Sequence, residues 1–378
     1  MRFIHVADLH IGKKVNEFSM IADQTYILNE ILKITEEYKA DAVIIAGDIY
    51  DKTVPPLDAV QLFDSFLTRL MQMNVYVFAV SGNHDSAERI SFGASIMKKS
   101  NVFVSPIYKG ASEPVKLHDE YGYINVYLLP FIKPIHVRNA YPDAEIHTYD
   151  DAVKYAVDKM NTDVSERNII VAHQFVTGAQ RCESEELSIG GLDDIDYKTF
   201  EKFDYAALGH IHGAQHCGVP HVRYSGTPLK YSFSECCHKK SVTVVDVKEK
   251  GNVEISTVPL KALHDMREIK GTYMEITDRR NYIGTDTDDY MHITLTDEED
   301  IPDAIGKLRA IYKNIMRLDY DNIRTRSFSE VGTARITKEK TPVDLFSDLY
   351  EMQNNQSLCE EQRKLLEEII ERTEGKSK

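Results

Sequence analysis

Five short apolar runs in this 378-residue sequence end in side chains that can bind metal ions. The run AVIIAGD ends in Asp48, and FIHVADLH, VYVFAVSGNHD, IIVAH and YAALGHIH supply the remaining potential ligands Asp8, His10, Asn83, His173, His210 and His212. Carboxylate, amide and imidazole groups without a thiolate suit divalent ions of intermediate hardness, such as Mn, Fe or Zn. Because seven ligands exceed the needs of one tetrahedral ion, they predict two ions that share Asp48.

Each of these runs has the length and β-branched composition of a buried strand. In open α/β sheets the binding site lies beyond the carboxyl ends of the strands, so we expect the five ends to converge. Gly47, Gly82 and Gly209 each precede a predicted ligand, where glycine permits the tight backbone of a strand-end turn. One histidine at a strand end is more often a surface group than a ligand, whereas five matches in order favour a metal site.

The motifs DLH, GDIYD, GNHD, VAHQ and GHIH, in this order, resemble the signature of the calcineurin-like metallophosphoesterases. The segments YSGTPLKYSFSE and LRAIYKNIMRLDYDN further resemble the SbcD subfamily of DNA nucleases, so the resemblance covers nearly the whole chain. It implies a manganese-dependent nuclease, with double-strand exonuclease and single-strand or hairpin endonuclease activity. Such an enzyme acts with an ATPase in DNA end processing, replication, recombination and repair.

The resemblance also implies how the site is divided. One ion is expected on Asp8, His10, Asp48 and His212, and the other on Asp48, Asn83, His173 and His210. His84 directly follows a ligand and is expected to protonate the leaving oxygen as general acid. Asp51 is the expected orienting partner of His84, and Asp85 is the alternative. Some archaeal relatives carry His at the position of Asp51, so the chain departs from them there.

Apolar periodicity divides the chain into three parts. Residues 1–258 alternate between strands and helices, with helices predicted at 24–38 and 57–73, and we expect a four-layer α/β/β/α sandwich. Residues 265–335 are expected to form a small α+β domain, with strands at 266–276, 290–295 and 314–318 and a helix at 302–312. Residues 341–378 are expected to form a tail of two helices separated by the polar stretch NNQS, and Thr341 and Pro342 begin the first of them as N-cap and first-turn proline.

The resemblance assigns a role to each of the two smaller parts. It implies that residues 265–335 are a capping domain that grips DNA, and that the tail binds an SbcC-like ABC/SMC-type ATPase in a heterotetramer. A domain without DNA contact and a tail folded back onto that domain are the alternatives. The helix expected at 57–73 is apolar on more than one face, which indicates either deep burial or contact with another subunit. The resemblance favours a homodimer that uses this helix and the helix expected after GNHD, around residues 89–99.

Charge and cysteine content limit the setting in which the chain acts. The formal net charge of −15 predicts weak autonomous affinity for DNA and a need for a partner. The five cysteines and the lack of an apolar leader or spanning segment indicate a cytoplasmic protein, which the resemblance places near the nucleoid. A structural zinc on Cys217, Cys236 and His238 is disfavoured because the CxxC spacing is missing.

Two other functions compete with the nuclease. A phosphoesterase for small nucleotides or phosphoproteins shares the metal motifs, but it needs neither the domain after residue 265 nor an amphipathic tail. A non-catalytic scaffold on the same fold has no chemical reason to keep seven ligands and His84.

Overall fold

The computed structural model describes residues 1–111, 113–180, 182, 194–322, 343, 346, 347, 350 and 357–374. They belong to two units, of which the first extends to Asn322 and the second contains helix α12 (Glu360–Glu374). Most of the first tail helix that the sequence predicts, and the segment that precedes it, lie outside the described residues. Within the described ranges, none of the helices has both the length and the apolar composition needed to span a bilayer.

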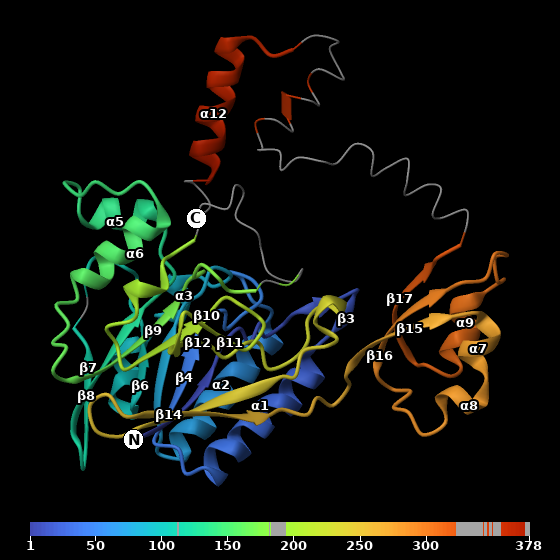
Figure 1. The fold of residues 1–378 in the computed structure, drawn as a ribbon, viewed down its shortest axis with the longest axis horizontal. Coiled ribbons are helices and arrows are strands. Elements are labelled where there is room, and N and C mark those ends of the chain that lie inside the picture. The colour runs from blue at the N-terminus through green and yellow to red at the C-terminus, as the bar shows by residue number, and fades with distance from the viewer. Residues whose placement is uncertain are drawn as a thin grey trace. The chain divides into compact units, whose positions relative to one another are not determined.

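Two six-stranded sheets form the centre of the first unit (Figure 1). In the first, the order is β14 (Val253–Pro259), β13 (Ser241–Val247), β1 (Arg2–Val6), β4 (Ala42–Ala46), β5 (Tyr76–Val80) and β6 (Val102–Val104). In the second, it is β11 (Gln215–Cys217), β12 (Val219–Tyr224), β10 (Tyr205–Gly209), β9 (Arg167–His173), β8 (Gly122–Leu129) and β7 (Val115–Asp119). Strands β1, β4, β5 and β6 run parallel, as do β8, β9, β10 and β12.

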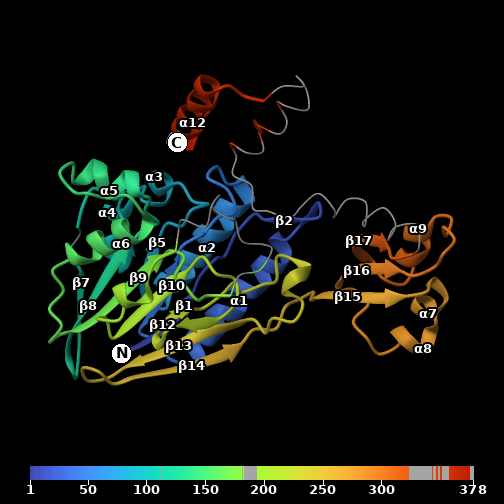
Figure 2. The ribbon, with the colours of Figure 1, turned by 45° about the horizontal axis from the view of Figure 1, so that its top comes forward.

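The sheets pack face to face, and helices cover their outer faces (Figures 1 and 2). The core between the sheets includes Phe3, Phe78 and Tyr205. Helices α1 (Ile21–Glu37) and α2 (Leu57–Gln72) pack on the first sheet, and α5 (Pro134–Ala140) and α6 (Tyr149–Asp158) pack on the second. These four layers confirm the predicted α/β/β/α sandwich, although α5 and α6 are not among the helices predicted from the sequence.

Strand β4 shows why the strands that lead to the site are apolar throughout. Val43 and Ile45 face the helices, while Ala42, Ile44 and Ala46 face the other sheet. All five residues are therefore buried, as expected for a parallel strand covered on both faces. The chain can become polar only where the strand leaves the sheet, which is where Asp48 follows.

A second, smaller sheet domain follows the sandwich. Its parallel strands are β15 (Met266–Gly271), β16 (Tyr290–Leu295) and β17 (Asn314–Tyr320), and its helices are α7 (Tyr273–Thr277), α8 (Arg279–Tyr282) and α9 (Ala304–Arg309). The strand predicted at 266–276 is too long, because Thr272 caps α7 in a reciprocal bond with Glu275. The helix predicted at 302–312 is also too long, because α9 begins only after Asp303.

The segment predicted as one helix around 89–99 is instead broken. It forms α3 (Ala87–Ile90) and α4 (Ala94–Met97), followed by a 3₁₀ turn at Lys98–Ser100. Gly93, which precedes α4, has a φ of 76°, which interrupts a right-handed helix.

A short hairpin, formed by β2 (Lys14–Val15) and β3 (Phe18–Ser19), follows the ligand motif DLH.

Candidate metal centre

The first group of predicted ligands comes from both sheets. Asp8 and His10 follow β1, while His212 follows β10, and potential ligand atoms of the three lie within 4.8 Å of one another. The Nε2 atoms of His10 and His212 are 3.2 Å apart. Metal–nitrogen bonds of about 2.1 Å place adjacent ligands of one ion roughly 3 Å apart, so this spacing fits two imidazoles on a common cation.

The second group is centred on Asn83, which follows β5. Its Oδ1 lies 2.9 Å from His173 Nε2 and 3.0 Å from His210 Nδ1. His173 Nδ1 lies 2.9 Å from the carbonyl of Ala46, and because that carbonyl can only accept, Nδ1 carries the proton. In the neutral ring that binds a metal ion, Nε2 of His173 is then the nitrogen whose lone pair is directed at the site.

Asp48 lies between the two groups. Its Oδ2 is 3.4 Å from His173 Nε2 and 3.7 Å from His10 Nε2. Its Oδ1 accepts a hydrogen bond from the main-chain N–H of His84 at 2.9 Å. One carboxylate thus faces ligands of both groups, which is the position that a shared ligand requires.

The backbone is strained at the predicted ligands. Asp8, His10, Asp48 and His210 have φ values of 53°, 43°, 47° and 105°, in a region that residues other than glycine rarely adopt. Such conformations cost about 1–3 kcal/mol each and persist where the surrounding structure holds them, often at functional sites.

The three glycines that precede ligands are required for two different reasons. Gly47 has a φ of 84°, as the sequence analysis expects for a strand-end turn. Gly82 and Gly209 do not, but a Cβ on Gly82 would overlap Asp48 Oδ1, and one on Gly209 would overlap the Ala46 carbonyl oxygen. Close approach of the backbone to the ligands, rather than φ, therefore accounts for these two glycines.

The electrostatics of the site favour a cation. Burial alone would lower the pKa of His173, but the carboxylates of Asp48 and Asp8 raise it to about 9. His5 within β1 is equally buried, and this burial, together with the nearby Arg223, lowers its pKa to about 3. The carboxylates thus give the site a negative potential that His5 does not experience.

The donor set fits a pair of divalent ions. Within the described part of the chain, Nδ1 of His10 is buried without a hydrogen-bond partner, and the Asp51 carboxylate 3.8 Å away faces it, so Nε2 is the nitrogen turned toward His212. In such a site two ions would supply Lewis-acid activation of a water molecule for attack on phosphorus. By contrast, among the residues that the structure describes, no cluster of potential ligands includes Cys217, Cys236 or His238.

His84 points into the same site, with its Nε2 3.9 Å from Asp48 Oδ2. Its Nδ1 lies 3.0 Å from the main-chain carbonyl of Asp51, not from the Asp51 carboxylate. That carboxylate instead accepts from Lys13 Nζ at 2.6 Å and lies 3.8 Å from His10 Nδ1. Asp51 thus contacts His84 through its main-chain carbonyl and not through its carboxylate.

Asp85 connects two loops of the site through hydrogen bonds to their main chains. Its carboxylate accepts from the main-chain N–H groups of Ile49, Tyr50 and Gly82 at 2.9–3.0 Å. These bonds tie the loop after β4 to the loop after β5, and so hold Asp48 beside Asn83.

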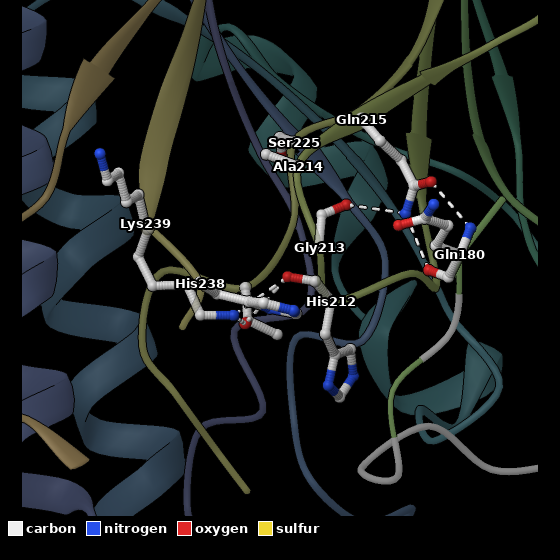
Figure 3. A pocket seen from close by; sticks show the side chains of 10 residues that line it. Gln180, His212, Gly213, Ala214, Gln215, Ser225, His238 and Lys239 are labelled. Carbon is white, nitrogen blue, oxygen red and sulfur yellow. Dashed lines mark hydrogen bonds between the residues drawn. The ribbon is translucent and has the colours of Figure 1, made fainter. Parts of the chain in front are cut away.

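Glu235, in the segment YSGTPLKYSFSE, is a further residue of the site that the sequence motifs do not indicate. Its Oε1 is 3.5 Å from His212 Nδ1, and Cys182 lies in the same cluster of potential ligands. A pocket of about 370 Å³ adjoins the main chain of His212 and is lined by residues that include Gln180, Gln215, His238 and Lys239 (Figure 3). His212 is the one predicted ligand that lines this pocket, and its imidazole points away from Gly213 and Ser225.

Residues 1–214, more than half of the chain, match the family model described as calcineurin-like phosphoesterase. The chain belongs to the calcineurin-like phosphoesterase family. Residues 262–354 match a second model, described as the type 5 capsule protein repressor C-terminal domain. The five motifs that carry the predicted ligands all lie within the first match.

One curated relative aligns over almost the whole chain. It is the SbcD subunit of the nuclease SbcCD from Staphylococcus epidermidis, which is 29% identical over 377 residues and 98% of each chain. Among solved structures, the protein TT1561 of Thermus thermophilus gives a TM-score of 0.40 at 12% identity over 68% of this chain and 98% of its own. A dimetal phosphatase from Danio rerio gives 0.36 at 12% identity, over 69% and 99%.

Proposed function

We propose that this chain is a two-metal DNA nuclease that acts with an SbcC-like ATPase on DNA ends, in repair, recombination and replication. The observation that carries the proposal is the convergence of seven ligands and His84 at one edge of the two sheets. The full-length similarity to an SbcCD nuclease subunit supports DNA, rather than a small nucleotide or phosphoprotein, as substrate. Both double-strand exonuclease and single-strand or hairpin endonuclease activity are proposed.

The seven side chains would hold two ions, for which we propose Mn²⁺. Asp8, His10, Asp48 and His212 would bind one ion, and Asp48, Asn83, His173 and His210 the other. His84 is held with Nδ1–H donating to the Asp51 carbonyl and Nε2 facing the site, a geometry suited to delivering a proton to the leaving oxygen. Asp51 contributes its carbonyl to this orientation, and its carboxylate balances Lys13.

We propose a separate role for each of the three parts of the chain. Residues 1–258 form the nuclease domain, 265–335 a capping domain that contacts DNA, and 341–378 the tail that binds the ATPase. The net charge of −15 supports this division, because a chain of this charge needs a partner to hold DNA. We place the complex in the cytoplasm, near the nucleoid.

Exposed apolar side chains support a homodimer. Leu57 on α2 is 72% exposed, and Phe92 and Ile96 near α4 are 85% and 75% exposed. Residues of α2 and Ile90 of α3 pack in the same hydrophobic core, so this core holds the two helices next to each other. Apolar side chains exposed to this degree on neighbouring elements are typical of an interface.

Cleavage assays test the proposed substrate. Purified chain with Mn²⁺ is expected to degrade blunt duplex DNA and to cut hairpins, and the co-expressed ATPase is expected to increase both rates. Turnover of a phosphomonoester with no cleavage of DNA, alone or with the ATPase, would favour the small-substrate phosphoesterase and contradict the proposal.

The ATPase contact has a separate test. Leu365 on α12 is 58% exposed, so Leu365→Asp and deletion of residues 340–378 are both expected to abolish co-purification with the ATPase. Co-purification that survives the deletion would refute the docking role of the tail.

A further inference from the structure

A buried ion pair lies beside the metal centre and takes no part in the proposed reaction. Glu235, in the 3₁₀ turn Phe233–Glu235, is fully buried, and its Oε2 accepts from Lys240 Nζ. Lys240 directly precedes β13 and is only 8% exposed at its side chain. Replacing a buried ion pair by apolar residues is often neutral or stabilising, so stability alone does not explain this pair.

Both partners of the pair reach His212, but at different ends of the residue. Glu235 Oε1 lies 3.5 Å from Nδ1 of the imidazole. Lys240 Nζ donates to the His212 carbonyl at 3.0 Å and to Thr227 Oγ1 at 2.6 Å. The ring and the main chain of His212 are thus held by one charged unit.

Other residues between Gly226 and Lys240 lie against the main-chain carbonyl of His212 or against Glu235. The N–H of Thr227 donates to the carbonyl at 3.1 Å. Gly226 has a φ of 75°, and a Cβ at this position would lie 2.6 Å from the same oxygen. Tyr231 N–H donates to Glu235 Oε1 at 3.3 Å, which fixes the carboxylate in turn. The segment from Gly226 to Lys240 therefore converges on one residue, which is a predicted ligand.

We propose that Glu235 is a positioning residue, which orients His212 by accepting its Nδ1–H and so directs Nε2 to the metal shared with His10. A carboxylate behind a ligating imidazole fixes its tautomer and ring orientation and increases its basicity. The inference deepens the proposed function and rests on its metal centre. It also gives the segment YSGTPLKYSFSE a role, since its glycine, threonine, tyrosine and glutamate all serve His212 directly or through Glu235.

Metal binding, measured without DNA or ATPase, tests the role. Full-length Glu235→Gln is titrated with Mn²⁺ by isothermal calorimetry and by electron paramagnetic resonance of the free ion. The wild-type chain is expected to bind two ions. In the variant, one site is expected to weaken by about 10–100-fold, the usual effect of removing such a partner, while the other keeps its affinity.

Asp119→Asn is the matched control. Asp119 forms a buried ion pair with Arg167, which begins the strand that His173 ends, so the pair lies at the other end of β9 from the ligands. This variant also leaves a buried cation without its carboxylate, and it is expected to lose stability but to bind both ions as wild type does. A loss of Mn²⁺ affinity equal to that of Glu235→Gln would show a general structural effect and would overturn the positioning role.

A second variant removes both charges. The double variant Glu235→Gln, Lys240→Met leaves no unpaired buried ion, so it can replace the single variant if that one does not fold. The same selective loss of Mn²⁺ affinity at one site is expected. If either variant folds and binds Mn²⁺ at both sites with wild-type affinity, the proposal is overturned. It is also overturned if Cys182→Ala weakens Mn²⁺ binding and Glu235→Gln does not. Absence of Mn²⁺ binding by the wild-type chain would instead refute the metal centre itself, and the role of Glu235 with it.

Discussion

Replacing His84 by Gln separates proton delivery from metal binding. The His84 side chain is 17% exposed, and its Nδ1 lies 3.0 Å from the Asp51 carbonyl. Its contact with Asp48 Oδ1 uses the main-chain N–H, which the substitution leaves in place. The variant is therefore expected to keep both ions.

The substitution is expected to change the activation free energy of cleavage more than the free energy of unfolding. Loss of one hydrogen bond changes the free energy of unfolding by about 0.5–1.5 kcal/mol. Loss of a general acid lowers the rate by about 10²–10⁴-fold, which corresponds to about 3–5 kcal/mol in the activation free energy. Activity should therefore fall far more than stability.

Two substrates make the assay specific for His84. Single-turnover cleavage of duplex DNA in Mn²⁺ is compared with cleavage of a nitrophenyl phosphodiester, whose leaving group departs without a proton. The variant is expected to lose about 10²–10⁴-fold on DNA and little on the activated ester. An equal loss on both substrates, or near-wild-type cleavage of DNA with metal bound, would refute the role of His84 as general acid.

Three further predictions concern single residues. Asp48→Ala should remove both ions, since its carboxylate faces both ligand groups, and metal analysis showing two retained ions would contradict this. Burial would raise the pKa of Asp119, but Arg167 and the N-terminal ammonium hold it well below its usual value, so its stabilisation is present above about pH 4 and declines as the pH falls. Asp119→Asn should therefore cost about 3 kcal/mol at pH 7 and less at pH 3 in urea unfolding, and an equal cost at both would contradict the assignment. Phe92→Asp should convert a dimer to a monomer in light scattering, whereas Met274→Asp, at a 74% exposed residue of α7, should not.

The sequence identified those parts of the site that follow directly from strand composition. A run such as AVIIA can be apolar throughout only if both faces are buried, so the polar residue after it marks a strand end. Five such ends on two sheets gave the seven ligands and the four-layer fold. Gly47, Gly82 and Gly209 were also identifiable, although only Gly47 uses a positive φ.

The features that the sequence missed depend on tertiary contacts or local capping. Glu235 approaches His212 only because the fold brings the 3₁₀ turn before β13 next to the residue that follows β10, and no spacing in the sequence encodes that approach. The contact of His84 with Asp51 uses a main-chain carbonyl, which any residue type would supply. The strand predicted beyond Gly271 failed because Thr272 and Glu275 form a capping box, a signal present in the sequence but outweighed by the apolar residues around it.

Anomalous scattering from crystals of the chain grown with Mn²⁺ tests the metal centre most directly. Two peaks are expected, roughly 3.5–4 Å apart. One should lie among Asp8, His10 and His212 and the other among Asn83, His173 and His210, with Asp48 between them. A single peak, or peaks away from Asp48, would contradict the two-metal account.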